Sequence, residues 1–463
     1  EGFGGQVKDF TEELIQTLDS RQQELADLSR EIWEYAELSE EEHRSSRRLA
    51  AYLKENGFAV EEGVCGLPTA FCAKWGSGNP VISFLGEYDA LPGLSQKALP
   101  EQAPVRAGAP GHACGHNLLG SGMAGSAAAV RGLLERYRLP GTVQYFGCPA
   151  EEIMLGKIVM AKQGAFDSSD VCLTWHPMAS NTVSDYSYSA MTSMKFTFLG
   201  KTAHAAAAPE QGRSALDAVE LMNVGANYLR EHIIPQARVH YVITDGGGKP
   251  NVVPGRAQSW YYVRAPYKEQ VEEITKRLID VSNGAALMTG TTVMHEVLSG
   301  CSNTILNGPL NRLLYESMTR VPVPDWTQEE LEFAKKLQDT FPDQVRRNAL
   351  LEFSVMELEG QILHSGVTPL KAAPAFLAGS TDVSDVSAAV PTGQVFTCCM
   401  PVGTPGHTWQ VAACAGMSIG QKGMLYAAKV IADTAMRLFC MPELLAEIKA
   451  DFKQTGGRNG GSE

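Results

Sequence analysis

Three side chains that can bind metal ions are grouped in residues 111–120, which read GHACGHNLLG. Cys114 and His116 stand two residues apart among glycines, which allow the backbone to approach a bound ion closely. A bound divalent ion would hold the Cys114 thiol deprotonated, since the thiolate is the ligand. Taken alone, the segment is also compatible with a buried free cysteine beside two loop histidines. The interpretation as a metal site therefore depends on whether the chain offers further ligands.

Two adjacent carboxylates, Glu151 and Glu152, follow the stretch 141–149. We expect this stretch to form a buried strand and a turn, where two unpaired carboxylates would repel each other unless a cation lay between them. One carboxylate can bind a metal ion while its neighbour acts as general base on metal-bound water. A solvated helix start, where the helix dipole favours acidic side chains, is the alternative.

Two histidines follow other predicted strands. His176 comes at the end of one strand, and His407 lies in a loop rich in glycine and proline after another. A single histidine of this kind is usually packed or caps a turn, but several successive loops with such residues are hard to explain by chance. Asp89, after a further strand, is suited either to orienting a metal-bound side chain or to capping its own turn.

The composition limits the classes of partner. The chain has 463 residues and a formal net charge of −13, which argues against nucleic acid and anionic membranes and favours a small-molecule substrate. No apolar run reaches the length of a membrane span, and the first residues show no secretion signal. Ten cysteines without a disulfide spacing indicate reduced thiols. We therefore expect a cytoplasmic protein of two domains.

An α/β catalytic domain is expected in two parts, residues 1–187 and 301–463. Short apolar runs predict buried parallel strands whose C-terminal ends carry the candidate residues. Residues 7–53 predict two surface helices, 328–332 a solvated charged face, and the tail 456–463 a disordered segment. The other predicted elements are strands at 81–85, 170–175 and 394–398, a strand with its turn at 141–149, a helix at 124–137 and a final helix at 422–439.

Between residues 188 and 300 the predicted order changes to βαββαβ, which is typical of a ferredoxin-like module. His204 lies there among small residues that give a substrate close access. Asn251 and Arg264 are further polar candidates, although a turn residue and a strand-edge charge also explain them. The module's predicted strands are 191–198, 238–244, 259–264 and 291–298, and its helices are 215–230 and 268–286.

Seven short motifs occur in the order found in one enzyme family. They are GEYDALPG, GHACGHNLLG, AEE, TWHP, GKTAHAA, NVVP and GTPGHTWQ. Over about residues 10–440 the chain therefore resembles the dinuclear-metal aminoacylase and carboxypeptidase family of amidohydrolases. Further segments, among them GRSALDAV and ARVHY, resemble in detail a branch of this family that acts on p-aminobenzoyl-glutamate.

The resemblance implies a zinc-peptidase-like catalytic domain with a mixed, mainly parallel sheet, and an inserted ferredoxin-like α+β dimerisation domain. It implies Glu151 as general base and two divalent ions, zinc or manganese. The implied metal ligands are Cys114, His116, Glu152, His176 and His407. It also implies that His204 crosses a dimer interface to polarise the scissile carbonyl of the neighbouring site, with Asn251 and Arg264 near the substrate carboxylate. The dimer is expected to be a homodimer or a heterodimer with a homologous subunit.

The implied activity is metal-dependent hydrolysis of the amide bond of an N-acyl or N-aroyl amino acid such as p-aminobenzoyl-glutamate. The alternatives are a dipeptidase acting on unusual dipeptides and a non-catalytic subunit that pairs with an active homologue. An inert subunit should have lost ligands, and none is visibly lost. The chain departs from relatives at Asn117, where many have aspartate, and at Ile153-Met154-Leu155, where glycine usually follows the acids. The second change predicts a narrower pocket and a different substrate choice.

Overall fold

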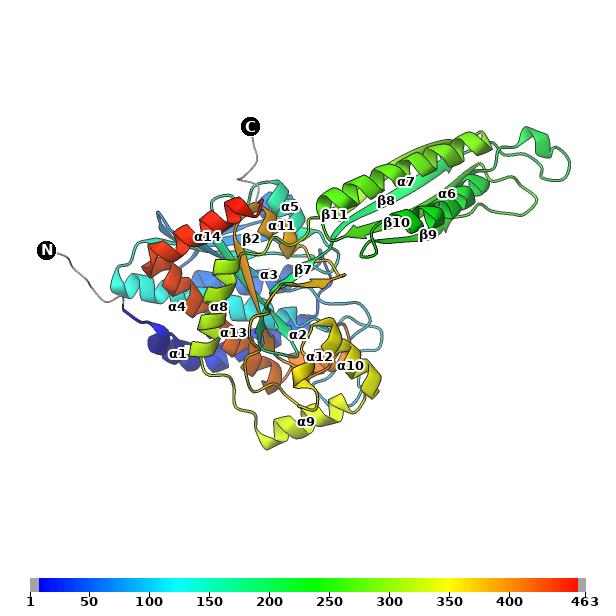
Figure 1. Cartoon of the computed structure of the whole chain (residues 1–463). Coiled ribbons are helices and arrows are strands. Elements are labelled where there is room, and N and C mark those ends of the chain that lie inside the picture. The colour runs from blue at the N-terminus through cyan, green and yellow to red at the C-terminus, as the bar shows by residue number, and fades with distance from the viewer. Residues whose placement is uncertain (1–7, 457–463) are drawn as a thin grey trace. The chain divides into compact units, whose positions relative to one another are not determined.

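The computed structural model (Figure 1) describes residues 8–456, which divide into two units. One unit combines three chain segments. The first ends at Tyr186, the second is Ile305–Ala375, and the third begins at Asp385. The other unit consists of Ser187–Thr304 and the short segment Phe376–Ser384. We call them the sheet unit and the inserted unit.

The sheet unit is built on a seven-stranded sheet with the strand order β1-β2-β4-β3-β5-β13-β6. The central strands β4, β3, β5 and β13 are mutually parallel, whereas β1, β2 and β6 join antiparallel at the two edges. The predicted mixed, mainly parallel sheet is therefore confirmed. The strands are β1 (Ala59–Glu62), β2 (Phe71–Ser77), β3 (Val81–Gly86), β4 (Gly141–Gly147), β5 (Val171–Met178), β6 (Thr182–Val183) and β13 (Thr392–Cys398).

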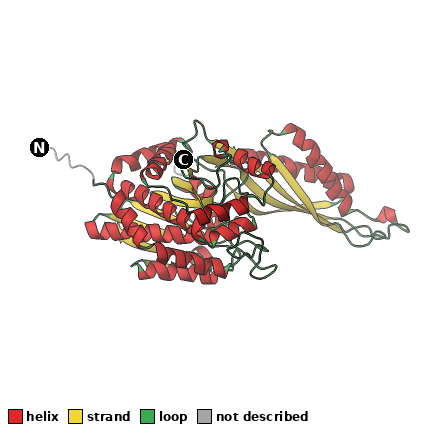
Figure 2. Cartoon of the chain, turned by 90° about the horizontal axis from the view of Figure 1, so that it is seen from below, coloured by secondary structure: helices red, strands yellow, loops and turns green. Residues whose placement is uncertain are grey.

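Side chains alternate between the two faces of this sheet, as the period of a strand requires. In β4, Val143 and Tyr145 pack in the larger core, and Phe146 packs in a smaller core on the other face. Helices cover both faces, so that the strands lie between them (Figure 2). Helices α5 (Gly156–Lys162) and α11 (Val383–Ala389) cover the smaller core.

Most helices of the sheet unit contribute to the larger core. They are α1 (Thr11–Ser20), α2 (Gln22–Tyr35), α3 (His43–Glu55), α4 (His116–Tyr137), α8 (Gly308–Arg320), α9 (Gln328–Gln338), α12 (Trp409–Ala415), α13 (Ser418–Cys440) and α14 (Pro442–Gln454). A Cβ atom at Gly120 would lie 2.5 Å from the Glu87 carbonyl oxygen, so glycine lets the N-terminal part of α4 approach the end of β3. This unit also contains α10 (Asp343–Glu352).

The inserted unit has the order β8-α6-β9-β10-α7-β11, and its antiparallel sheet has the strand order β11-β8-β10-β9. This is the predicted ferredoxin-like arrangement. Both helices pack on one face of the sheet over a core that includes Phe196, Phe198 and Tyr261 (Figure 1). The elements are β8 (Ala190–Leu199), α6 (Ala215–Leu229), β9 (Arg238–Asp245), β10 (Arg256–Ala265), α7 (Lys268–Thr289) and β11 (Thr292–Cys301).

Two short strands, β7 (Tyr186–Tyr188) and β12 (Ala375–Leu377), pair where the chain passes between the units. Single 3₁₀ turns occur at Val64–Gly66, Pro209–Gln211, Arg230–His232 and Met356–Leu358. None of the helices within residues 8–456 combines the length and apolarity that a membrane crossing requires.

Three sequence-based expectations about the elements were wrong. Residues 7–53 contain three helices with buried apolar faces, because the helical pattern continues through the break at Arg21. Helix α14 follows the helix that was expected to be the last one. Glu330 is buried rather than solvated, since its carboxylate lies 2.8 Å from the Lys422 ammonium and caps the start of α9. Most of the tail expected to be disordered, residues 457–463, lies outside the described residues.

Candidate active site

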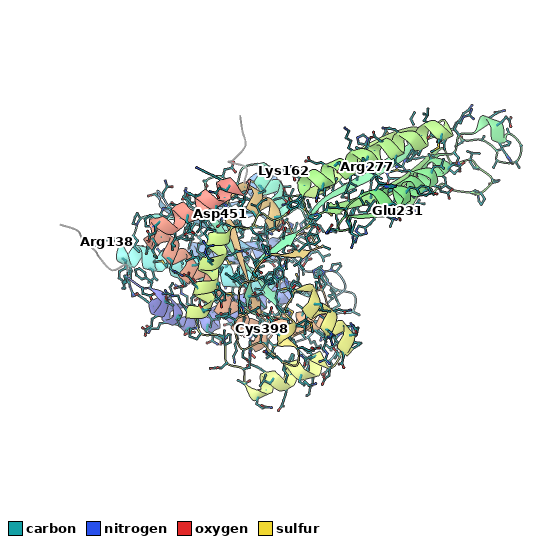
Figure 3. The ribbon with its side chains drawn as sticks, in the orientation of Figure 1. Arg138, Lys162, Glu231, Arg277, Cys398 and Asp451 are labelled. Carbon is teal, nitrogen blue, oxygen red and sulfur yellow. The ribbon has the colours of Figure 1, made fainter. Side chains whose placement is uncertain are left out.

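The C-terminal ends of four adjacent parallel strands carry the polar residues of the candidate site. Glu87 and Asp89 follow β3, and Glu151 and Glu152 follow β4. His176 lies near the end of β5, which continues to Met178, three residues beyond its predicted end. The loop after β13, whose last residue Cys398 is labelled in Figure 3, leads to His407. Because parallel strands end at the same edge of the sheet, these side chains converge there.

The structure brings all five expected ligands together in overlapping groups. Cys114 Sγ lies 3.4 Å from His176 Nε2, and Glu152 Oε2 lies 3.3 Å from His407 Nε2. In each group the potential ligand atoms lie within 4.8 Å of one another, as ligands of one metal ion must. The groups are Cys114, His116 and His176; Cys114, Glu152 and His407; and Glu87, His116 and Glu151.

The imidazole of His116 is oriented by carboxylates on both sides. Its Nδ1 lies 2.8 Å from Asp89 Oδ1, so the ring donates a proton there and directs Nε2 toward Glu87 and Glu152. Asp89 also accepts hydrogen bonds from the Ser39 hydroxyl at 2.8 Å and the Glu152 backbone N–H at 2.9 Å. A carboxylate that orients a histidine ligand in this way is common in metal sites. Asp89 thus occupies the orienting position considered for it from the sequence.

Three buried polar atoms at the centre of the site have no hydrogen-bond partner among the described residues. They are Glu87 Oε2, His116 Nε2 and Glu152 Oε1. Glu87 Oε2 and His116 Nε2 are 3.0 Å apart, yet their geometry is not that of a hydrogen bond. Buried polar atoms without partners are costly, and a divalent cation between them would remove that cost. The donor set therefore fits a metal centre.

Burial and neighbouring charges shift the protonation of the ligand candidates. Burial raises the pKa of the Cys114 thiol well above its usual range, with the Glu152 charge adding to the effect. Burial lowers the pKa of His176 to about 4, which keeps this imidazole neutral and able to bind an ion. Burial opposes the charged form of His116, but electrostatic interactions with Cys114, Glu87 and Asp89 outweigh it and raise the pKa of this imidazole well above its usual range. Metal binding at this site must therefore release protons, as is usual for thiolate sites.

The backbone is strained at three residues of the site. Ala150, Met154 and His407 have positive φ angles of 56°, 57° and 58°, a region that is unfavourable for residues other than glycine. The buried Glu42 carboxylate accepts a hydrogen bond from the Ala150 N–H at 2.8 Å and so holds the turn before the paired acids. Burial raises the pKa of Glu42 to about 7. Such strain clusters at functional sites because the surrounding contacts must hold it.

Three residues near the site were not singled out from the sequence, namely Glu42, Glu87 and Lys157. Glu87 belongs to the acidic turn after β3, and its Oε1 lies 2.7 Å from the fully buried Lys157 Nζ. A lone lysine in the apolar start of α5 was the available signal for Lys157. Nothing in the sequence around Glu42 distinguishes it from the exposed acids beside it.

The sequence departs from many relatives at Asn117 and at residues 153–155, and these two positions have different surroundings in the structure. Asn117 does not face the ligands, because its buried Nδ2 donates to the carbonyl oxygens of Ser29 and Ala415 and so links α4 to α2 and α12. The carboxylate next to His116 is Asp89 instead. Ile153 is 49% exposed, so this first residue of the apolar segment points largely toward solvent.

The inserted unit holds the other expected site residues. His204 is exposed, and its Nδ1 accepts hydrogen bonds from the backbone N–H groups of Ala206 and Ala207 at 3.3 and 3.2 Å. The Asn251 carbonyl oxygen accepts from the Ala205 N–H, so the loops of His204 and Asn251 are paired. Arg264 lies in β10 and donates to the Ser380 hydroxyl at 2.8 Å.

Comparison with known proteins identifies the family. Residues 188–287 match the M20 peptidase dimerisation domain. The chain is 42% identical over 449 residues to one subunit of the p-aminobenzoyl-glutamate hydrolase of Escherichia coli (strain K12), and the match covers 94% of this chain and 93% of that protein. The chain belongs to the M20 peptidase family. The family resemblance of the motifs is therefore confirmed.

Two further comparisons add a curated relative and a solved structure with the same fold. An Xaa-Arg dipeptidase of Mus musculus is 32% identical over 452 residues, covering 94% of this chain and 90% of that protein. A dinuclear metal-binding M20 peptidase of Bacillus subtilis has the same fold, with a TM-score of 0.60 and 17% identity over 91% of this chain and 99% of that one. This M20 protein is a metal-dependent amidohydrolase.

Proposed function

We propose that this enzyme hydrolyses the amide bond between an aroyl or acyl group and an amino acid, with p-aminobenzoyl-glutamate as its substrate. The proposal is carried by one observation. Candidate metal donors lie close together, several of them buried without a hydrogen-bond partner among the described residues, in a chain 42% identical to a p-aminobenzoyl-glutamate hydrolase subunit over nearly its whole length.

The proposed centre holds two divalent ions, zinc or manganese. Its proposed ligands are Cys114, His116, Glu152, His176 and His407. When bound, such ions lower the pKa of a water molecule toward neutrality and polarise a carbonyl group. Five donors exceed the needs of one tetrahedral site, which is why two ions are proposed.

Glu151 is the proposed general base. Its Oε2 lies 3.9 Å from His116 Nε2, so its carboxylate faces the ligand cluster. In the reaction, Glu151 takes the proton of the attacking water while the water oxygen bonds to the amide carbon. It then delivers that proton to the nitrogen of the leaving amino acid as the C–N bond breaks.

His204 of a partner subunit is proposed to stabilise the oxyanion. Because its Nδ1 accepts backbone N–H groups, the neutral ring carries its proton on Nε2 and can donate it to a carbonyl oxygen. One such donor is typically worth about 3 kcal/mol in the transition state. Asn251 and Arg264 are proposed to bind the substrate carboxylate.

The proposed domain roles follow from this arrangement. Residues 1–187 and 301–463 would form the catalytic domain, and residues 188–300 would dimerise and cover the site. The partner would be a second copy or a homologous subunit in the cytoplasm. A homologous partner is supported by the Escherichia coli relatives, because two of them are named as different subunits of one hydrolase.

Two other functions remain to be tested against this one. Similarity to an Xaa-Arg dipeptidase favours a dipeptidase with a related mechanism. A non-catalytic subunit is the second alternative, but the presence of all five candidate ligands argues against it.

A substrate comparison tests the proposal. The purified chain, supplied with zinc or manganese, is offered p-aminobenzoyl-glutamate, other N-acyl-glutamates, N-acyl-aspartates and Xaa-Arg dipeptides, and amine release is measured. We expect p-aminobenzoyl-glutamate to give the highest kcat/KM, and a Glu151→Gln sample to define the background. Preferential cleavage of dipeptides would assign the dipeptidase function instead.

A further inference from the structure

Glu87 is a buried carboxylate whose two oxygens have different surroundings. It is 1% exposed and follows the last residue of β3. Its Oε1 forms an ion pair with Lys157 Nζ at 2.7 Å. Its Oε2 lies 3.0 Å from His116 Nε2, and neither atom has a hydrogen-bond partner among residues 8–456. The carboxylate is thus fixed at one oxygen and unsatisfied at the other.

Lys157 reaches Glu87 because α5 begins very close to the preceding turn. A Cβ atom at Gly156 would lie 1.8 Å from the Pro149 carbonyl oxygen, so only glycine permits this start of the helix. The Lys157 side chain is fully buried. A buried ion pair contributes little to stability compared with apolar residues of similar size, so stability alone does not explain this lysine.

The spacing around Glu87 Oε2 is that of metal ligands. Metal–nitrogen and metal–oxygen bonds of about 2.0–2.2 Å place two ligands of one ion roughly 3–3.5 Å apart. The separation of Glu87 Oε2 and His116 Nε2 falls in this range. A ligand atom of Glu151 lies within 4.8 Å of both residues' ligand atoms. An ion at His116 would therefore be within reach of Glu87.

We propose that Glu87 is a sixth protein ligand of the metal centre, binding through Oε2 the ion held by His116, and that Lys157 is the positioning residue that fixes this oxygen. The inference rests on the metal centre of the proposed function. Lys157 balances the added negative charge and occupies Oε1, which leaves Oε2 for the ion. The pair thus adds a ligand to the site without adding net charge.

Metal-binding measurements test the proposal without using activity. Wild type and variants are equilibrated with buffered free zinc, and bound zinc per chain is measured by mass spectrometry across the titration. We expect Glu87→Gln to weaken one of the two binding steps at least tenfold and to leave the other unchanged. Lys157→Met should weaken the same step in the wild-type background but have no further effect in Glu87→Gln.

Two further variants control for charge and folding. Lys162→Met removes the lysine at the far end of the same helix (Figure 3), which is exposed, and should bind zinc as wild type does. The double variant Glu87→Gln/Lys157→Met removes both buried charges, so it tests the ligand role even if a single variant fails to fold.

Each result decides between the proposals. Two wild-type binding steps in Glu87→Gln or in the double variant would overturn the ligand role and leave the five-ligand centre standing. An effect of Lys157→Met that persists in Glu87→Gln would overturn the positioning role. A wild-type chain that binds no zinc and no manganese would overturn the metal centre itself, and the role of Glu87 with it.

Discussion

Glu151 and Glu152 are neighbours in the chain but have different partners in the structure. Glu152 Oε2 lies 3.3 Å from His407 Nε2. Burial alone would raise the pKa of Glu152, but this contact and the His116 charge lower it. Its side chain is 6% exposed, whereas that of Glu151 is 14% exposed. The two acids are thus suited to separate tasks, one as a ligand and the other as a base that water can reach.

Substitution of each acid should therefore give a different defect. We expect Glu151→Gln to keep its metal while kcat falls roughly 10²–10⁴-fold, since only proton transfer is lost. Glu152→Gln should lose at least one ion, because a neutral amide is a poor ligand. Metal analysis and kinetics on both variants check this. The reverse pair of phenotypes would show that the two roles are exchanged.

His364 belongs to none of the candidate metal-ligand groups and is buried as a hydrogen-bond acceptor. Its Nδ1 accepts the Asn181 N–H at 2.9 Å, and burial lowers its pKa from 6.5 to about 4. Between these values the unfolded chain binds more protons than the folded one, so stability falls as the pH drops through 6.5 toward 4. Most of this effect should appear between pH 7 and pH 5.

Replacing this histidine should remove that part of the acid sensitivity. We expect the wild type to lose roughly 2 kcal/mol more stability than His364→Asn between pH 7 and pH 5, because the amide oxygen accepts the same bond but does not titrate. Urea unfolding of both proteins at the two pH values measures the difference. Equal losses would mean that His364 is not held neutral in the fold.

The elements themselves were largely predictable, because strands and helices leave periodic patterns. The runs at 81–85, 170–175 and 394–398 became β3, β5 and β13, and the βαββαβ order of the inserted unit was also correct. Parallel strands then explain why distant ligands meet at one sheet edge. The periodic patterns could not predict contacts between individual side chains, such as the ion pair between Lys157 and Glu87.

The turn between β4 and α5 shows what such contacts do. Glu42, just before α3, accepts the Ala150 N–H through one oxygen and the Thr69 hydroxyl at 3.0 Å through the other. It therefore ties the start of α3 to the strained residue that precedes the paired acids. No sequence pattern reports a bond between residues 108 positions apart.

Removing this link should destabilise the turn and the fold. We expect Glu42→Leu to lower the free energy of unfolding by about 2–4 kcal/mol, because it leaves two buried donors unpaired. Thr69→Val breaks only the second bond and should cost about 1 kcal/mol. Chemical denaturation of both variants gives the comparison. A Glu42→Leu value no larger than that of Thr69→Val would show that the Ala150 bond contributes nothing.

At the scale of the whole molecule, the chain has a family dimerisation domain and its proposed oxyanion donor lies in that domain. His204 is outside the sheet unit that carries the metal ligands. The proposal that it acts on the site of a partner subunit came from the family resemblance of the motifs. Under this proposal, each complete active site contains residues from two chains.

This proposal predicts complementation between two inactive variants. Glu151→Gln and His204→Ala chains, mixed and allowed to exchange, should recover about one quarter of wild-type activity, since about half of the dimers are mixed and each has one intact site. Metal content must first be normal in both variants. A mixture of Glu151→Gln with Glu152→Ala is the control. It should stay inactive, because each site takes both acids from a single chain and every chain in the mixture lacks one of them. If exchange is shown by a tag pull-down and the first mixture also stays inactive, His204 does not act across subunits.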